Sequence, residues 1–391
     1  MNILFLLQSF PTYGGISVVT TILANQFIKD GHNVTTASLW IRYPELKEQL
    51  DPSIDIYKLD YPVTSAKTIK NLRQIIIKKN IDILINQWGL PFKTTILCRK
   101  ATKGTKCKII SVLHGSPYIS KVLLSTRDKI ENTQNVIVKT FYKGIYTLKE
   151  EIVKGSIRYN CKHNDQFIVL SESFIKPLMK FSKLKDSSNI SAIGNPITVP
   201  VVFDESEIYQ KKKQLLYVGR MDFENKRVNR ILEAWECIYD EFKDWELILV
   251  GDGPHKDTLQ KYVHQKKIER VQFKGFQKEP PIKYYKDASI FLLTSDLEGF
   301  GLVIVESMSY GVVPIVYGSY EAVFDIINPG ISGFITSQPY NQAQTVEYIR
   351  MLIKNNDLRI KMGQQAMIDA KKFSLQSICK KWYDLFDKLL N

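Results

Sequence analysis

Short, predominantly apolar runs recur along the whole chain, and they constrain the fold more than any other feature of the sequence. Runs of four or five residues suit strands that are buried on both faces, as in parallel sheets. The eight runs are Ile3–Leu7, Ile81–Ile85, Ile109–Leu113, Phe167–Leu170, Leu215–Val218, Leu247–Val250, Ile290–Leu293 and Val312–Val316.

Helical spacing lies between these runs, because apolar residues recur there every three or four positions. Two examples are Ile16, Val19, Leu23 and Phe27, and Ile231, Trp235, Ile238 and Phe242. Strands that alternate with such helices indicate right-handed βαβ units. The sequence therefore predicts an α/β fold.

The strand series runs twice, which predicts two Rossmann-like domains of similar size. A polar stretch around Ser187–Pro196 and the charged segment Asp204–Lys213 separate the two series. We expect domains at residues 1–195 and 196–372. Residues 373–391 form a terminal amphipathic helix, because Ile378, Trp382, Leu385 and Leu389 share one helical face.

The charge of the 391-residue chain is asymmetric. The formal net charge is +14, and residues 1–200 hold 28 Lys and Arg against 14 Asp and Glu, so the second half is neutral. An excess of this size in one half predicts an anionic partner, whether nucleic acid, membrane or phosphorylated substrate. The basic residues are dense between Lys93 and Lys129, where Tyr118–Ile130 is a candidate amphipathic helix for an anionic membrane. The alternative is a solvated basic face whose apolar residues pack inward.

Cysteine usage and hydropathy bear on the compartment. The five cysteines are scattered without a CxxC pair, which fits a reducing cytosol. The apolar N-terminus has no basic flank typical of a secretory signal, and no run approaches the roughly 20 apolar residues of a membrane span. We expect a cytoplasmic protein, either soluble or peripheral on the inner face of the membrane.

The most informative segment for chemistry is Thr294–Glu306. A predicted strand ends near Leu293, a glycine-containing loop follows, and a helix begins near Gly301. Ligands of open α/β sheets bind at the carboxyl ends of strands, and free amides at a helix start suit a diphosphate. The amides in question belong to Phe300, Gly301, Leu302 and Val303.

Two carboxylates, Glu298 and Glu306, flank this helix start. They are eight residues apart, up to ~12 Å along a helix, which is comparable with the distance from a ribose to a sugar across a diphosphate. One could hold ribose hydroxyls while the other holds a sugar. The alternative is one acid near the helix dipole and one solvated acid.

Further candidates follow other predicted strands. Arg220 and Lys226 combine a planar fork with a flexible point charge, which suits a diphosphate, although a solvated loop is the alternative. Gly14 and Gly15 allow close backbone approach to a phosphate or sugar, but they lack the full dinucleotide fingerprint. His114 follows a strand directly and has no partner at metal-ligand spacing. The chain has no Asp-x-Asp triplet, so we expect no metal site.

These motifs together resemble the retaining glycosyltransferases of family four. The resemblance rests on Glu298–Glu306 with Gly219-Arg220, Lys226 and Val250–Pro254, and it extends in order to Gly14-Gly15, His114, Leu170–Glu172 and Gly194–Pro196. It implies the GT-B architecture, with two facing Rossmann-like domains. The donor then binds the C-terminal domain, the acceptor binds mainly the N-terminal one, and the last helix crosses back to the first domain.

The resemblance also implies a role for each matching residue. Glu306 would bind the ribose hydroxyls and Glu298 the transferred sugar. Amides near Phe300–Leu302 would support sugar and phosphate. The diphosphate would be neutralised by Arg220 and Lys226 and approached by Gly15, His114 would touch the sugar, and the base would lie near Phe276. The family needs neither metal nor cofactor, since the nucleotide sugar is a co-substrate.

Several positions depart from the family pattern. Asn195-Pro196-Ile197-Thr198 replaces Asn-Gly-Val-Asp, Arg227 replaces a glycine, Ser319–Ala322 replaces Gly-Gly-x-x-Glu, and Ile16-Ser17 replaces Ala-Glu. The expected function is transfer from a nucleoside diphosphate sugar, commonly a UDP-sugar, to a hydroxyl of a bacterial polysaccharide or lipid-linked glycan. The alternatives are a nucleotide-sugar hydrolase or epimerase, and a basic membrane or nucleic-acid binding module with a decayed donor pocket. The intact charged set argues against that module, so we expect no nucleic-acid partner.

Overall fold

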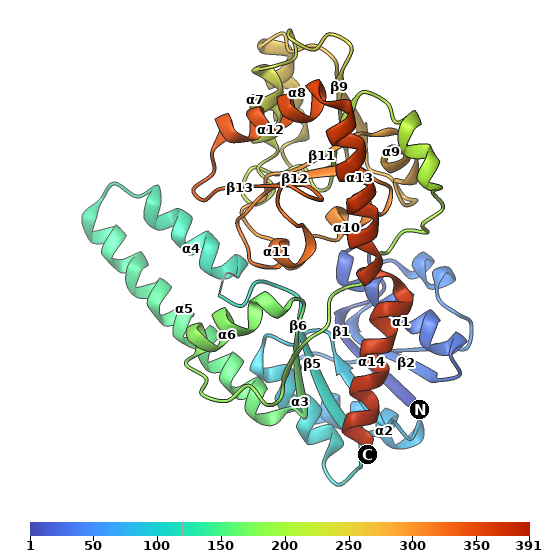
Figure 1. The fold of residues 1–391 in the computed structure, drawn as a ribbon. Helices are drawn as coiled ribbons and strands as arrows, with labels where there is room; N and C mark the ends of the chain where they lie inside the picture. Colours follow the sequence, from blue (N-terminus) through green and yellow to red (C-terminus); the bar gives the residue numbers. More distant parts are fainter. Residues whose placement is uncertain (119) are drawn as a thin grey trace. The chain divides into compact units, whose positions relative to one another are not determined.

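The chain forms two compact units. The computed structural model describes residues 1–118 and 120–391, with only the backbone of Lys121 and Val122. Unit 1 comprises Met1–Asn195 and Ile378–Asn391, and unit 2 comprises Pro196–Ser377. Each unit has one parallel sheet flanked by helices (Figure 1), so the predicted α/β class with parallel sheets is confirmed.

Unit 1 is built on a sheet that has seven strands within the described residues, in the order β3-β2-β1-β4-β5-β6-β7. Its strands are β1 (Asn2–Ser9), β2 (Asn33–Trp40), β3 (Asp55–Lys58), β4 (Ile83–Asn86), β5 (Lys108–Leu113), β6 (Gln166–Val169) and β7 (Ile190–Ala192). Its helices are α1 (Gly15–Lys29), α2 (Ala66–Lys78), α3 (Phe92–Thr102), α4 (Lys121–Glu131), α5 (Val136–His163) and α6 (Ile175–Ser182).

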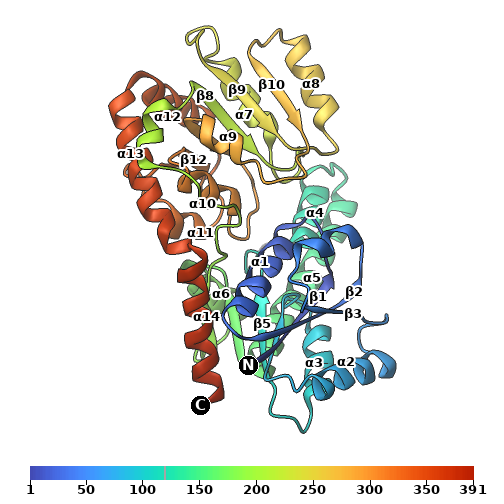
Figure 2. The same ribbon diagram turned by 90° about the vertical axis from the view of Figure 1, so that its right-hand side faces the viewer.

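Unit 2 has a sheet of six described strands in the order β10-β9-β8-β11-β12-β13. Strands β8, β9 and β10 lie side by side in Figure 2. The strands are β8 (Gln214–Val218), β9 (Glu246–Val250), β10 (Val271–Gly275), β11 (Ile290–Leu293), β12 (Val313–Tyr317) and β13 (Phe334–Thr336). The helices are α7 (Val228–Glu236), α8 (Lys256–Gln265), α9 (Ile282–Asp287), α10 (Leu302–Ser309), α11 (Ala322–Ile326), α12 (Gln342–Lys354) and α13 (Asn356–Ala370).

Both sheets reverse their winding direction at one point, which determines where a ligand can bind. In unit 1 the order turns between β1 and β4, and in unit 2 between β8 and β11. Loops diverge at such a switch point and leave a crevice at the carboxyl ends of the strands. Gly14 and Gly15 follow β1, Arg220 and Lys226 follow β8, and Glu298 follows β11. The sequence candidates therefore lie at the two switch points.

The terminal helix α14 (Leu375–Leu390) packs onto unit 1 rather than onto the unit that precedes it. Phe386 is fully buried and makes an edge contact with Phe27 of α1, with ring centroids 5.7 Å apart. Tyr383 donates a hydrogen bond from its hydroxyl to Asp30. The amphipathic pattern after Phe373 thus becomes a helix that returns to the first unit, as predicted.

Three local predictions need correction. Ile16 is 42% exposed, because α1 begins at Gly15 and this residue faces the loop crevice instead of the core. Helix α7 ends at Glu236, and Ile238 is buried in the turns beyond it. The basic helix expected at Tyr118–Ile130 begins at Lys121.

In that basic helix, Leu123 is buried and Leu124 is half-buried, so these two apolar side chains pack at least partly against the rest of the unit. Ile119 and the side chains of Lys121 and Val122 lie outside the described residues. Among the helices that the structure describes, none combines the length and the apolar composition that crossing a bilayer requires.

Candidate active site

Beside the switch point of unit 2, the loop after β8 packs closely against the backbone of the loop after β9. Gly251 has φ +131°, and a Cβ there would lie 1.9 Å from the carbonyl oxygen of Gly219. A Cβ on Gly253 would lie 2.3 Å from the carbonyl oxygen of Met221. Only glycine fits this approach, so the Gly-Asp-Gly turn after β9 supports the loop that carries Arg220.

The loop after β8 is held by Asp222, a residue without a role in the sequence prediction. Its Oδ1 accepts hydrogen bonds from the amides of Asn225 at 2.9 Å and Lys226 at 2.7 Å. Its Oδ2 lies 3.6 Å from Nε of Arg220, whose side chain is 60% exposed. Arg220 is therefore positioned by Asp222 and still presents most of its guanidinium to solvent, where a phosphate can reach it.

Lys226 is paired with Glu298 across the two loops. The Nζ of Lys226 lies 2.5 Å from Oε1 of Glu298, and both side chains are largely buried. The sequence predicted both residues as binding groups, and the structure brings them together. Opposite charges this close stabilise each other, so each side chain is the other's counter-ion in the ligand-free protein.

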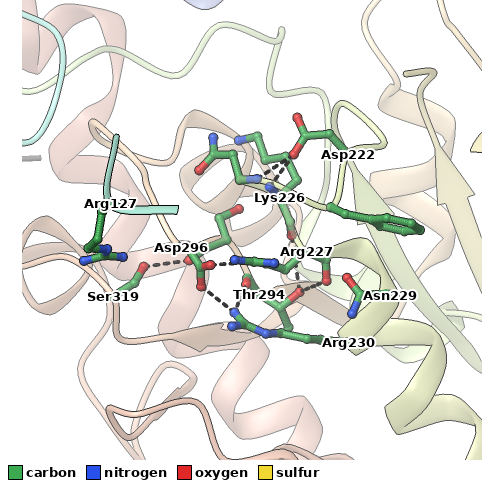
Figure 3. A network of polar contacts seen from close by, with 12 residues as sticks. Arg127, Asp222, Lys226, Arg227, Asn229, Arg230, Thr294, Asp296 and Ser319 are labelled. Carbon is green, nitrogen blue, oxygen red and sulfur yellow. Dashed lines mark hydrogen bonds and ion pairs between the residues drawn. The ribbon is translucent and has the colours of Figure 1, made fainter. Parts of the chain in front are cut away.

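A second ion pair next to it was not predicted. Arg227 and Arg230 both point to Asp296 (Figure 3), with nitrogen–oxygen distances of 2.5 and 2.6 Å. Arg230 also donates to the carbonyl oxygen of Thr294 at 2.9 Å and lies 4.4 Å from the ring centroid of Tyr340. Arg227, which departs from the family's glycine, has φ +51°, in the left-handed region. This cluster locks the loops after β8 and β11 to each other.

Helix α10 begins with free amides. Gly301 has φ +88°, and a Cβ there would lie 2.6 Å from the hydroxyl of Tyr320, so a side chain is excluded. Among the side chains that the structure describes, none caps this helix start with a hydrogen bond. The amides of Leu302 and Val303 therefore stay available to an anion, with the helix dipole in support. The Phe300 side chain itself is buried against Phe373, so only its backbone can take part.

Glu306 lies on α10 and is only 6% exposed. One carboxylate oxygen accepts a hydrogen bond from the Thr198 hydroxyl, and the other accepts one from Tyr285 at 2.9 Å. Burial raises the pKa of Glu306, and the two hydrogen bonds act in the opposite direction. The alternative of a solvated acid is wrong, since the carboxylate is held by its neighbours. Each oxygen keeps a lone pair for a further donor.

Unit 1 carries a pocket of about 500 Å³ at its own switch point. Gly14 caps α1 without a side-chain hydrogen bond, and Gly15 is its first residue. Four aromatic side chains and one cation line the pocket beside these glycines. They are Tyr13, Trp40, Tyr43, Trp88 and Arg42. The sequence analysis missed the aromatic residues, because they lie at the end of β2 and in the loops after β1, β2 and β4.

His114 reaches the edge of this pocket through a neighbour. It lies directly after β5, and its Nε2 is 2.5 Å from Oε1 of Gln87, a lining residue. An amide oxygen only accepts, so Nε2 carries the proton. Burial lowers the pKa of His114 to about 4, so the ring is neutral at pH 7.

Two further observations complete the site. Phe276, expected near the base, follows β10 and is 52% exposed. Within residues 1–118 and 120–391, no three His, Cys, Asp or Glu side chains are grouped as a metal ion would require. The candidate residues thus form one set in unit 2 and another in unit 1.

Comparison with known proteins places this geometry in a family. The model of glycosyltransferase family 4 matches residues 13–199, and that of group 1 glycosyl transferases matches residues 200–368. Together they account for nearly the whole chain. The protein belongs to the family 4, or group 1, glycosyltransferases.

Individual relatives support this assignment. The chain is 25% identical to N-acetyl-alpha-D-glucosaminyl L-malate synthase of Bacillus anthracis, over 91% of this chain and 89% of the relative. It is 25% identical to alpha-monoglucosyldiacylglycerol synthase of Acholeplasma laidlawii, over 95% of each. A crystal structure of Anabaena HepE with UDP superposes with a TM-score of 0.75 at 16% identity, over 99% of this chain and 100% of that chain. The fold is therefore GT-B.

Proposed function

We propose that this glycosyltransferase transfers a sugar from a UDP-sugar to a saccharide hydroxyl, with retention of configuration and without a metal ion. One observation carries the proposal: two cations and an uncapped helix start meet at the switch point of unit 2. Planar guanidinium, ammonium and free amides are the groups that bind phosphates in proteins. The UDP complex of HepE supports uracil as the base.

Within this proposal, Glu306 binds the ribose hydroxyls and Glu298 contacts the transferred sugar. Thr198 and Tyr285 hold the Glu306 carboxylate in one orientation, so it is prepared for binding before the nucleotide arrives. Fixed acceptors of this kind cost little reorganisation on binding. Phe276, which follows β10 of the same sheet, lies near the nucleobase.

In the proposed reaction, the departing diphosphate itself accepts the proton of the acceptor hydroxyl. The bond between the anomeric carbon and the phosphate oxygen breaks, the acceptor oxygen bonds to that carbon on the same face, and the departing phosphate oxygen takes the acceptor's proton. Arg220 and Lys226 stabilise the charge that develops on the diphosphate, in the role a metal has in other transferases. His114 is a weak base, because its pKa is about 4, so it serves as a neutral contact to the sugar.

The acceptor pocket in unit 1 supports a saccharide. Aromatic side chains present flat apolar surfaces with polar edges, and such pockets orient a ligand through a few placed polar groups. The aromatic rings that line the pocket suit the apolar face of a sugar ring, and Arg42 suits a phosphate or carboxylate on the acceptor. A lipid-linked acceptor at the inner face of the cell membrane fits a cytoplasmic enzyme of this kind.

Calorimetry with UDP and the full-length protein tests the donor site. We expect Arg220→Ala and Lys226→Ala each to weaken binding at least tenfold. Lys243→Ala is the matched control, because Lys243 is an exposed lysine just before the start of β9, at the opposite end of the strands. Unaltered affinity in both site variants would refute the diphosphate assignment. Release of free sugar from UDP-sugars without any acceptor would favour the hydrolase instead.

A further inference from the structure

Arg227 occupies a backbone conformation that an arginine rarely adopts. Its φ of +51° lies in the left-handed region, which is unfavourable for a residue with a side chain. Glycine, the residue that Arg227 replaces in the family pattern, adopts this conformation without cost. A non-glycine residue persists there where the surrounding structure compensates for the cost, and such positions concentrate at functional sites. The arginine side chain makes an ion pair with Asp296, and that contact is what the replacement of glycine adds.

The Asp296 side chain is held at both of its carboxylate oxygens. The Nε of Arg227 lies 2.5 Å from Oδ2, and Nη1 of Arg230 lies 2.6 Å from Oδ1. Figure 3 shows both guanidinium groups directed at this one carboxylate. Hydrogen bonds between charged groups are strong and directional, so two of them on different oxygens hold the carboxylate in one orientation. Without Arg227, Asp296 could pivot about the single contact with Arg230.

The Arg227–Asp296 pair lies beside two residues of the donor site. Arg227 follows Lys226 directly in the sequence, and Glu298 lies only two residues beyond the aspartate. The ion pair between Lys226 and Glu298 therefore joins the same two loops as the pair beside it. The backbone joins them as well, because the amide of Asp296 donates to the carbonyl oxygen of Asn225 at 2.7 Å. Loss of the arginine side chain would consequently loosen both loops at the point where they carry the site residues.

We propose that Arg227 is a positioning residue of the donor site, which acts through Asp296 to hold Lys226 where it meets the diphosphate. This inference rests on the proposed function, since it concerns the same donor site. Groups that are held in place before the ligand arrives cost less to order on binding, so Arg227 increases affinity for the phosphate part of the nucleotide. The ribose ligand Glu306 is held separately, by Thr198 and Tyr285, and does not depend on Arg227.

Calorimetry of the full-length protein with UDP and with uridine tests the proposal. Arg227→Gly removes the ion pair and relieves the backbone, so the melting temperature should stay close to that of the wild type. We expect UDP affinity to fall by about fivefold or more, whereas the affinity for uridine, a nucleoside without phosphate, should not change. Arg270→Gly is the matched control, since Arg270 has φ +57°, pairs with Glu269 at 2.9 Å and precedes β10 at the opposite end of the strands. It should bind both ligands as the wild type does.

A double-mutant cycle tests whether Arg227 acts through Asp296. The double variant Arg227→Gly/Asp296→Ala should bind UDP no more weakly than Asp296→Ala alone. Additive losses would mean that Arg227 contacts the ligand itself, which contradicts a positioning role. An equal loss of UDP and uridine affinity in Arg227→Gly would also refute the proposal, because the residue would then support the fold of unit 2 as a whole. Wild-type affinity for both ligands would refute it directly.

Hydrogen exchange measures the loop after β11 without any ligand. The amides of residues 294–300 should exchange about fivefold faster or more in Arg227→Gly than in the wild type or in Arg270→Gly, because the loop has lost one of its two anchors. Equal exchange in the three proteins would overturn the proposal whether or not a nucleotide binds. A wild type that binds no UDP would instead refute the proposed function, so the two failures are distinguishable.

Discussion

Replacing Tyr285 by phenylalanine should destabilise the protein more at pH 8 than at pH 4. The hydroxyl of Tyr285 donates to the buried Glu306 carboxylate at 2.9 Å, and the substitution leaves that oxygen without this partner. A hydrogen bond to a charged group contributes roughly 1.5–3 kcal/mol, whereas one between neutral groups contributes roughly 0.5–1.5 kcal/mol. The loss should therefore depend on whether Glu306 is ionised.

The pKa of Glu306 determines in which direction this destabilisation changes with pH. Burial already raises the folded pKa above the unfolded value, and loss of the donor raises it further. A carboxyl with a raised folded pKa destabilises the fold as pH rises above the unfolded pKa, and the full cost is present above the folded pKa. We expect a deficit of about 2 kcal/mol at pH 8 and about 1 kcal/mol at pH 4, where Glu306 is protonated.

Urea denaturation followed by circular dichroism measures both deficits. Tyr310→Phe is the matched control, because Tyr310 is a buried neighbour that stacks on Tyr285 with centroids 5.9 Å apart. Its hydroxyl donates to the carbonyl oxygen of Pro200, a neutral acceptor, so its deficit should change little with pH. Equal deficits of Tyr285→Phe at the two pH values would refute the account of Glu306 as a buried, hydrogen-bonded anion.

The other predictions concern the proposed reaction. Glu306→Gln should weaken UDP binding by about one to two decades in calorimetry, because the charge-assisted bonds to ribose are lost, and unchanged affinity would sink the ribose assignment. Arg220→Ala and Lys226→Ala should lower kcat strongly and leave the free energy of unfolding nearly unchanged. Excess EDTA should leave the wild-type rate unaltered, and a loss of rate that Mg²⁺ restores would contradict the metal-free reaction. The pKa of His114 falls to about 4 on folding, so lowering the pH from 7 to 5 protonates the ring in the unfolded chain but not in the folded protein. Over this range the wild type should lose about 2 kcal/mol more free energy of unfolding than His114→Asn. Parallel pH profiles of the two proteins in urea denaturation would show that the ring is not buried as a neutral group.

Most strands of the two sheets could be predicted from the sequence, because strands that are buried on both faces consist of continuous apolar runs. Strand β2 is the instructive exception. It is buried along most of its length, but Thr35, Thr36 and Ser38 interrupt its apolar pattern. Its backbone pairs with β1 and β3, and Ser38 donates to the carbonyl oxygen of Trp40. Buried polar residues whose hydrogen bonds are made within the sheet do not show the apolar pattern from which a buried strand is predicted.

Part of the candidate site could also be predicted from the sequence. Lys226, Glu298 and Glu306 belong to motifs that are visible in the local sequence. The residues that hydrogen-bond to Glu306 are not, because Thr198 lies 108 residues and Tyr285 lies 21 residues away along the chain. The substitution of Asp by Thr at position 198 was visible, but only the structure shows that this hydroxyl donates to a buried carboxylate. Contacts of this kind depend on tertiary packing, which spacing along the chain does not encode.

The return of α14 makes unit 1 discontinuous, with unit 2 inserted between Asn195 and Ile378. During synthesis on the ribosome, unit 2 can complete its fold while unit 1 still lacks the helix that covers Phe27. The nascent first unit then exposes an aromatic surface that α14 covers only after all of unit 2 has emerged. A chain that ended just before Ile378 would hold all of unit 2 and a unit 1 that lacks most of α14.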